Sequence, residues 1–347
     1  MTTIHLDPLI AEARRRARRR RVLYAVLVLG AAGVAAAWLS SRGSGAAPPA
    51  DAVVRGTPTP RVVVEAGRTG TQDGWAMNGL GLWVTRDAGA TWSATTPPRV
   101  KGQDVVARVL QVQFVDAVHG WVSGADIPGR AGRYAMLFRT TDGGRTWFHS
   151  RANCAWCGST LSFPNVNVGF TLAATTLYRT GDGGLRWQRV ATAPFRGRIA
   201  FTDARRGWGA GWNGGLYRTL DGGRTWSLVA EGRATLPQHG VAAVRAGNHG
   251  FVVDVHTGAR HPLPAVQAAT GIPVFSAATA RDLVTWAYRT FWASHDGGRT
   301  WTRFVTAARP KSVWDMQFAT ARDGWAIFDA TLVHTTDGGR HWAPLRR

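Results

Sequence analysis

Six copies of one eight-residue pattern, each ending in tryptophan, run through this chain of 347 residues. The pattern is Ser or Thr, any residue, Asp, any residue, Gly, any residue, then Thr, Arg or His, and finally Trp. It predicts a hairpin turn, in which the Asp carboxylate accepts hydrogen bonds from turn amides, glycines supply positive φ and the Trp opens the next strand. We call this pattern the box. The box residues that we expect to serve the fold are Asp87, Asp142, Asp182, Asp221, Asp296 and Asp337, with Trp92, Trp147, Trp187, Trp226, Trp301 and Trp342.

The boxes recur at intervals of about forty residues, a length typical of one propeller blade, but the interval from Trp226 to Trp301 is nearly double. A second motif, Gly followed by an aromatic residue, lies upstream of most boxes, and in four units a Phe precedes that aromatic by seven positions. Gly250-Phe251 repeats the motif inside the long interval, so we expect a unit without a box there. Trp286 is expected to mark the unit of the fifth box. The aromatic residues then mark seven units, at Trp75, Trp121, Phe170, Trp208, Phe251, Trp286 and Trp325.

Units of this length, with short alternating strands and turn residues, predict blades rather than a helical solenoid. We therefore expect an all-β fold, a seven-bladed β-propeller over residues 61–347, preceded by one N-terminal transmembrane helix. Within the fourth unit the strands are expected at Arg198–Phe201, Trp208–Trp212, Gly215–Arg218 and Thr225–Val229. The pooled Trp, Phe and Val residues supply a sufficient core, so neither a metal nor another cofactor is expected.

The repeat resembles the Asp-box (bacterial neuraminidase repeat) β-propellers. Within them, the dense spacing of Phe, Gly-Trp and the D-G-G-x-T-W boxes is most similar to the photosystem II stability/assembly factor family. The resemblance covers residues 61–347 and rests on positions that define the repeat. It implies a non-enzymatic protein that binds assembly intermediates of membrane proteins. The chain departs from the family's pattern by a polybasic N-terminus, an insertion in the second unit and a unit without a box.

The first sixty residues are typical of a membrane-targeting segment and a linker rather than of a folded domain. Residues 1–21 form a basic tail with seven arginines, and residues 22–39 form an uncharged run near the lower length limit of a membrane-spanning helix. The positive-inside rule keeps the tail in the cytoplasm and exports the propeller. Residues 40–60, rich in Gly, Ser, Ala and Pro, are expected to form a flexible linker. The alternative is a cleaved signal peptide, with Ala35–Ala37 as the small-residue cleavage site.

The chain carries a formal net charge of +21 and is rich in arginine. Arg139, Arg179 and Arg218 occupy the same position, just before the box, in three successive units. They are either solvated repeat positions or a basic arc that binds acidic protein segments, anionic lipid or acidic polysaccharide. Nucleic acid is not expected as a partner, because a hydrophobic span follows the basic tail directly. We expect the protein to be a monomer.

The two cysteines, Cys154 and Cys157, lie between the second and third units. On the oxidising side of a membrane, a local disulfide is the expected state. A thioredoxin-like redox motif would need a strand-to-helix context, and a zinc site would need two further ligands where only His149 is near. We therefore expect no metal at this position.

A sialidase-like glycoside hydrolase is the enzymatic alternative. Sialidases, as the family implies, use an arginine triad, a Tyr/Glu nucleophile pair and an Asp acid/base, and carry an Arg-Ile-Pro motif. No Arg-Ile-Pro occurs in this chain, and the only glutamates of the propeller are Glu65 and Glu231. The box aspartates are not catalytic candidates, because a catalytic site needs one constellation and these residues recur six times. We expect no catalytic residue. A glycosidase that uses a pair of Asp carboxylates is the alternative that these observations leave.

In a four-stranded blade, the loops between strands two and three and those between blades emerge on one face, and the boxes turn on the other. The second unit has an insertion at Ala125–Arg133 on the box-free side, and the cysteine loop Ser150–Gly158 follows on the same side. Because function concentrates in long loops on rigid scaffolds, we expect a partner-binding surface there. Its candidate residues are Asp126, Arg130, Arg133 and Trp156, with Arg139, Arg179 and Arg218 on the opposite side.

The sequence thus predicts a membrane-anchored, extracytoplasmic propeller that acts as a non-enzymatic scaffold for another envelope or membrane protein. A module that binds carbohydrate or polyanions is the first alternative. It would need exposed aromatic residues on the box-free face, a feature on which the sequence is silent.

Overall fold

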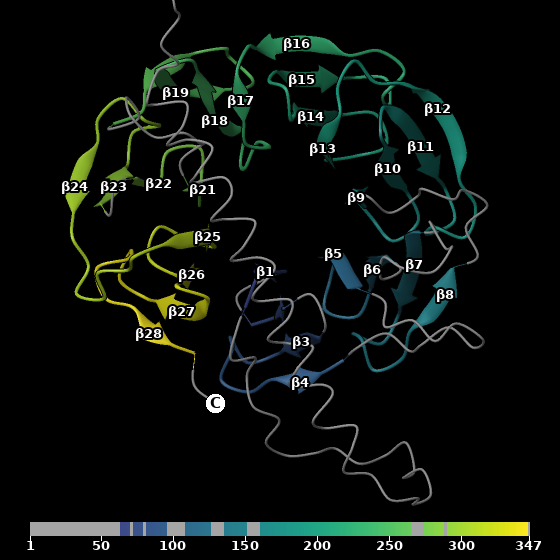
Figure 1. Cartoon of the computed structure of the whole chain (residues 1–347), viewed down its shortest axis with the longest axis horizontal. Helices are drawn as coiled ribbons and strands as arrows, with labels where there is room; N and C mark the ends of the chain where they lie inside the picture. The colour runs from purple at the N-terminus through teal and green to yellow at the C-terminus, as the bar shows by residue number, and fades with distance from the viewer. Residues whose placement is uncertain are drawn as a thin grey trace, which may run out of the picture. The chain divides into compact units, whose positions relative to one another are not determined.

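The computed structural model describes residues 63–69, 72–78, 81–95, 108–125, 135–150, 160–264, 274–287 and 290–345. These residues form seven four-stranded antiparallel sheets and no helix. The sheets follow one another around a common axis, with the first strand of each sheet innermost (Figure 1). The prediction of an all-β, seven-bladed propeller is confirmed.

Each blade is built from four strands that follow one another in the chain. In chain order the strands are β1 (Glu65–Arg68), β2 (Gly74–Met77), β3 (Leu82–Thr85), β4 (Ser93–Ala94), β5 (Arg108–Phe114), β6 (Gly120–Ala125), β7 (Ala135–Thr140), β8 (Phe148–Ser150), β9 (Leu161–Ser162), β10 (Gly169–Ala173), β11 (Thr176–Thr180), β12 (Gln188–Thr192), β13 (Gly197–Phe201), β14 (Gly207–Gly211), β15 (Leu216–Thr219), β16 (Ser227–Ala230), β17 (Arg233–Ala234), β18 (Val241–Ala246), β19 (His249–Asp254), β20 (Arg260–Pro262), β21 (Val274–Ala277), β22 (Leu283–Ala287), β23 (Thr290–Ser294), β24 (Thr302–Phe304), β25 (Val313–Phe318), β26 (Gly324–Phe328), β27 (Thr331–Thr335) and β28 (Ala343–Pro344).

The repeated Phe and Gly-aromatic motif packs neighbouring blades together. The ring of Trp121, on β6, stacks on Phe163 of the next blade, with centroids 3.8 Å apart and planes 6° apart. Phe170 and Phe201 repeat this contact one blade further on, at 3.5 Å and 7°. The glycine is required because the Phe ring lies over it: a Cβ on Gly169 would lie 2.3 Å from the Phe163 ring. The motif therefore encodes the contact between blades as well as the blade itself.

Polar side chains on the innermost strands add hydrogen bonds between blades. The side-chain amide of Gln113, on β5, accepts from the Phe163 amide at 2.9 Å and donates to the Phe163 carbonyl at 3.0 Å. Ser162 accepts from the Phe201 amide at 2.7 Å, and Ser276 accepts from the Phe318 amide at 2.9 Å. Buried backbone groups at the edges of the sheets thereby gain partners in the next blade.

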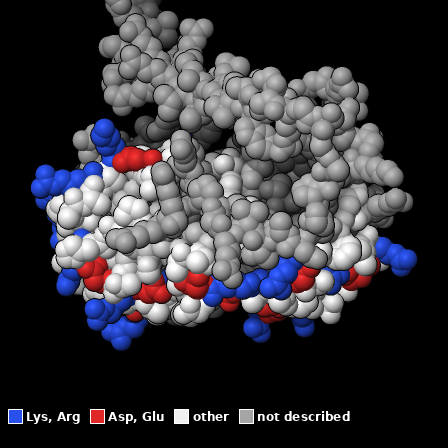
Figure 2. Space-filling view, turned by 90° about the horizontal axis from the view of Figure 1, so that it is seen from below, with Lys and Arg blue, Asp and Glu red and all other residues white. Residues whose placement is uncertain are grey.

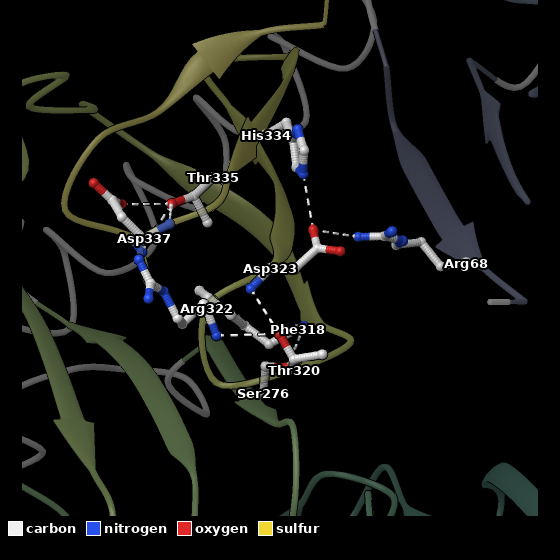
Figure 3. A network of polar contacts seen from close by, with 10 residues as sticks. Arg68, Ser276, Phe318, Thr320, Arg322, Asp323, His334, Thr335 and Asp337 are labelled. Atoms are coloured by element: carbon white, nitrogen blue, oxygen red, sulfur yellow. Dashed lines mark hydrogen bonds and ion pairs between the residues drawn. The ribbon is translucent and has the colours of Figure 1, made fainter. Parts of the chain in front are cut away.

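The ring closes without a strand shared between the ends of the domain, because the first blade is made of β1–β4 and the last of β25–β28. Closure depends on side chains instead. Arg68 of β1 donates to Oδ1 of Asp323 at 2.7 Å, and its guanidinium lies 5.0 Å from the centroid of the Trp325 ring. His334 also contacts Asp323, at 2.8 Å (Figure 3). The amide of Val63 donates to a carbonyl of the last blade at 2.9 Å.

The blade without a box corrects one expectation. The sheet order β17-β18-β19-β20 places Phe251 on the third strand, whereas the Gly-aromatic motif of other blades opens the second strand. The glycine that opens the second strand is Gly240, and Val241 follows it. In the next blade, Val284 stands opposite Ser276 of the innermost strand, which is the register that the repeat aromatic occupies in other blades. Trp286 stands opposite Val274, two residues away from that register. The interpretation of Phe251 and Trp286 as repeat aromatics was therefore wrong, although the number of units was right.

The expected anchor lies outside the described residues. Among the residues that the structure does describe, no helix is long and apolar enough to cross a membrane. The basic tail at 1–21, the anchor at 22–39 and the linker at 40–60 stay predictions from the sequence.

Candidate functional site

The antiparallel order of the strands gives the propeller two distinct faces. The boxes connect the third and fourth strands, so they share one face with the turns between the first and second strands. The connections between second and third strands, and those between blades, emerge on the opposite face. We call these the box face and the box-free face.

Each box is closed by its own hydrogen bonds. In the fourth blade, Thr219 Oγ1 donates to Asp221 Oδ1 at 2.9 Å and accepts from the Gly223 amide at 2.8 Å. The same Oδ1 accepts from the Thr225 amide at 3.0 Å, and Oδ2 accepts from the Thr225 hydroxyl at 2.6 Å. The indole N–H of Trp226 donates to the Gly223 carbonyl at 3.2 Å. Equivalent bonds from the first hydroxyl and from the amide four residues on surround Asp87, Asp142, Asp182, Asp296 and Asp337.

These bonds fix the charge state of the box carboxylates. Burial raises the pKa of Asp221, but hydrogen bonds from Thr225 and Thr219 outweigh it and lower the pKa to about 2. For Asp337, bonds from the amide and ring of His341 likewise outweigh burial, and the pKa falls to about 2. A carboxylate held ionised by its own turn has no proton to donate as a general acid.

The three repeated arginines lie in the third strands of blades two to four. Arg139, Arg179 and Arg218 each stand opposite the second-strand aromatic residue, and all three are half-buried. Arg139 reaches the box of the next blade, since a Cβ on Gly183 would lie 2.7 Å from its Nη1. From the side shown in Figure 2, Lys and Arg alternate with Asp and Glu along the described rim. Arg139 is thus placed between two blades, and Arg179 and Arg218 are half-buried at the same register.

The box-free face carries exposed aromatic and basic residues. Trp212, just after β14, is 65% exposed, and Trp314, at the start of β25, is 43% exposed. Arg196 accepts from the Trp212 amide through its carbonyl at 2.8 Å, so the two residues are neighbours. Arg196 and Arg198 are both exposed at the start of the fourth blade's innermost strand. Exposed tryptophans of this kind are frequent at binding surfaces.

Two carboxyl groups lie on neighbouring innermost strands, and the charge of Arg198 affects the pKa of both. Glu65 opens β1, and Asp315 lies on the adjacent innermost strand β25. Burial raises the pKa of Glu65 to about 7, with Arg198 opposing the rise and Asp315 adding to it. Burial also raises the pKa of Asp315, against the hydrogen bond from the Met316 amide and the charge of Arg198. The positive charge of Arg198, on the innermost strand of the fourth blade, opposes the rise in pKa of both carboxyl groups.

An open cleft of about 700 Å³ lies on the box-free face between the fourth and fifth blades. Its walls are the loop after β14, the connection from β16 to β17 and the loop after β18. The charged residues in it are Glu231, Arg233 and Arg245, and Tyr217 and Leu228 supply aromatic and aliphatic surface. Trp212 immediately precedes the cleft residue Asn213.

The predicted loop residues could not be placed. Asp126, Arg130, Arg133 and Trp156, together with the candidate disulfide partners Cys154 and Cys157, lie outside the described residues. The flanking strand ends are described: β6 ends at Ala125, β7 begins at Ala135, β8 ends at Ser150 and β9 begins at Leu161. These ends lie on the box-free side, as the order of strands in the second blade requires.

Sequence reasoning missed the residues that the structure gathers around the axis and the cleft. A signal was available, because Glu65 and Glu231 are the only glutamates of the propeller and both lie on the box-free face. In the described part of the chain, no group of three His, Cys, Asp or Glu residues is arranged to hold a metal ion.

Comparison with solved structures gives related propellers. YCF48 bound to a D1 peptide has a TM-score of 0.61 and 17% identity, and the match covers 81% of this chain and 95% of that chain. YCF48 from Cyanidioschyzon merolae has a TM-score of 0.54 and 17% identity, with coverages of 81% and 97%. The GH74 xyloglucanase from Xanthomonas campestris has a TM-score of 0.64 and 16% identity, with coverages of 82% and 54%, so this chain spans about half of that enzyme.

These similarities confirm the predicted resemblance to assembly-factor propellers at the level of the fold. Their sequence identities are too low to carry more than the fold. No protein-family profile matches the sequence, and no curated protein matches it.

Proposed function

We propose that this chain is a membrane-anchored, extracytoplasmic propeller that binds another envelope or membrane protein through its box-free face, without catalysis. The observation that carries the proposal is that Trp212 and Trp314 are exposed on that face, where Arg196 and Arg198 are exposed as well. Buried tryptophan and arginine contacts commonly dominate binding energy at protein interfaces. The box-bound carboxylates, by contrast, are occupied by their own turns.

The likeness to a propeller bound to a peptide supports the proposal. YCF48 with its D1 peptide shares the fold of this chain over nearly the whole length of that protein. A propeller of this size therefore offers a rigid surface on which an extended segment of a partner can lie. The basic composition favours an acidic partner segment, and a polybasic anchor would hold the propeller where membrane proteins are assembled.

In vivo crosslinking followed by purification of the anchored protein tests the proposal. We expect the double variant Trp212→Ala/Trp314→Ala to lose most of the crosslinked partner while keeping the wild-type circular dichroism spectrum. Leu185→Ala/Leu220→Ala is the matched control, because both leucines are exposed on the box face, at 55% and 54%. If the leucine variant loses the partner and the tryptophan variant keeps it, the box-free face is not the binding surface.

A glycoside hydrolase is the second candidate, and one observation favours it. Glu65 and Asp315 are carboxyl groups with raised pKa values, and Glu65, at about 7, is suited to general acid catalysis at neutral pH. The likeness to a xyloglucanase supports the same reading. Hydrolysis of a panel of polysaccharides by the wild-type protein, abolished in Glu65→Gln, would establish this function in place of the scaffold.

A further inference from the structure

The cleft between the fourth and fifth blades is lined by Arg233 and Arg245, and the Nε of Arg245 donates to the Gly247 carbonyl at 3.0 Å. Arg233 on β17 and Arg245 on β18 are direct cross-strand partners, so their side chains leave the sheet on the same side. Like charges placed opposite one another destabilise a sheet. Both residues line the open cleft, and Glu231 is the one acidic residue among its lining residues. An anionic group bound in the cleft would be attracted by both guanidinium groups.

The walls of the cleft are fixed in shape. The amide of Gly215 donates to the carbonyl of Gly232 at 2.6 Å, which ties the loop after β14 to the connection between the blades. Gly232 has a φ of +111°, and a Cβ there would lie 2.3 Å from the carbonyl oxygen of Arg245. Only glycine fits at this point. The two arginines are therefore presented by a backbone arrangement that tolerates little change.

Aromatic residues flank the charged pair. Tyr217 is held by stacking on Phe195, with centroids 4.9 Å apart and planes 17° apart. Its hydroxyl lies beside Gly215, since a Cβ on that glycine would be 2.8 Å from the oxygen. Trp212 adjoins the cleft and is 65% exposed. The cleft thus combines a flat aromatic surface, fixed hydrogen-bonding groups and a pair of guanidinium groups.

We propose that this cleft binds a carboxylated sugar, such as a uronate unit of an acidic polysaccharide. Two guanidinium groups match a carboxylate in charge and geometry. Asn213, Tyr217 and Glu231 supply hydrogen-bonding groups for hydroxyls, and the exposed Trp212, next to Asn213 in the chain, is an aromatic side chain on which a pyranose ring can stack. Leu228 is the one aliphatic side chain in the lining, so the cleft surface is polar apart from Tyr217 and Leu228. This site shares Trp212 with the proposed protein-binding surface, but sugar binding does not require the protein partner.

Isothermal titration of the full-length protein in detergent, with trigalacturonate as the probe, tests the proposal. We expect saturable binding that weakens about tenfold or more for the neutral methyl ester and for Arg233→Ala/Arg245→Ala, because each loses charge-assisted hydrogen bonds. Trp212→Ala should weaken binding by a similar factor. The matched control is Arg205→Ala/Arg206→Ala, two exposed arginines in a box-face turn of the fourth blade. It should bind like the wild type.

The remaining probes distinguish the sources of the carboxylate. Sialyllactose binding with the same variant dependence would keep the site but assign it to sialic acid rather than uronate. A tetraglutamate peptide that binds as tightly as trigalacturonate, and depends on the same arginines, would overturn the sugar assignment in favour of an acidic peptide. Absence of saturable binding to both sugars, or an equal loss in the control, would overturn the site. If the double arginine variant fails to fold, Arg233→Ala and Trp212→Ala decide, since both side chains are exposed.

Discussion

The guanidinium of Arg68 lies 5.0 Å from the centroid of the Trp325 ring, in the place that a phenylalanine occupies at four other blade junctions. Arg68 stands opposite Gly74, at the same register at which Phe201 stands opposite Gly207. The first blade therefore replaces the repeated phenylalanine by an arginine where it meets the last blade. This exchange keeps a planar group over the aromatic ring and adds a charged hydrogen bond to Asp323. The closure of the ring thus differs chemically from the four junctions at which Phe114, Phe163, Phe201 and Phe318 occupy this register.

Replacement of Arg68 should test this closure. We expect Arg68→Ala to lower the free energy of unfolding by about 1–3 kcal/mol, because the side chain is nearly buried and its loss leaves Asp323 with His334 alone. Arg68→Phe should lose less, since it restores the stacking of the other junctions. Urea unfolding followed by circular dichroism measures both variants.

Arg86 gives the matched control for this prediction. It pairs with Asp73 at 3.0 Å but its side chain is 40% exposed, so Arg86→Ala should change the stability by less than about 1 kcal/mol. If both alanine variants lower the free energy of unfolding equally, the buried position of Arg68 adds no stability beyond that of an exposed ion pair.

The raised pKa of Glu65 predicts how stability depends on pH. The folded state raises this pKa from 4.5 to about 7, so the folded protein prefers the protonated carboxyl. The resulting stability is fully present below pH 4.5 and is lost as the pH rises through 7. Glu65→Gln should therefore match the wild type near pH 4.5 and exceed its stability at pH 8, by on the order of 1–3 kcal/mol.

Thermal or urea unfolding at several pH values provides the measurement. Glu231→Gln is the control, because this glutamate is exposed on a loop and its replacement should follow the wild-type curve. A Glu65→Gln curve parallel to the wild type at every pH would refute the proposed axial environment.

The sequence was most informative where the repeat was complete. In the fourth blade, the predicted strands at Arg198–Phe201 and Trp208–Trp212 lie within one residue of β13 and β14. The positions of the strands are well determined there because the Phe, the Gly-Trp pair and the box all indicate the same register. In the blade without a box, Gly250-Phe251 matched the motif by chance, while Val241 held the true position. An aliphatic residue fills that site well enough to fold and leaves no aromatic signal to read.

The charged residues around the axis could not be predicted for a different reason. Glu65 and Asp315 are separated by nearly the whole domain, and they approach each other only because the ring closes between the first and last blades. No local pattern reports such a contact. The same holds for the cleft. Arg233 and Arg245 are neighbours because β17 pairs with β18, whereas the Gly250-Phe251 motif had placed the second strand of this blade where β19 lies.

The box aspartates give a prediction about folding. Asp221→Ala should leave turn amides and the Thr225 hydroxyl without their acceptor and lower the stability by about 1–3 kcal/mol. Partner binding by the folded fraction should persist. Leu220→Ala, at the exposed neighbouring position, should be close to neutral. A fully folded Asp221→Ala protein that no longer captures its partner would assign the box to binding instead of folding.

The N-terminal segment predicts an orientation in the membrane. The seven arginines of the tail should stay in the cytoplasm, and the propeller should lie outside. Protease added to intact cells should then remove the propeller and leave a small arginine-rich fragment in the membrane. Recovery of a soluble protein that begins near Trp38 or Ser40 would instead establish a cleaved signal peptide.

The last prediction separates the two faces as binding surfaces. Shortening Ala125–Arg133 to a tight turn should spare the fold, because these residues exceed the length of the repeat and the flanking strands β6 and β7 are intact. It should weaken partner capture in the crosslinking assay more than replacement of Arg139, Arg179 and Arg218 does, because those arginines are half-buried. A triple arginine variant that stays folded and loses the partner, while the shortened loop keeps it, would move the binding surface to the box face.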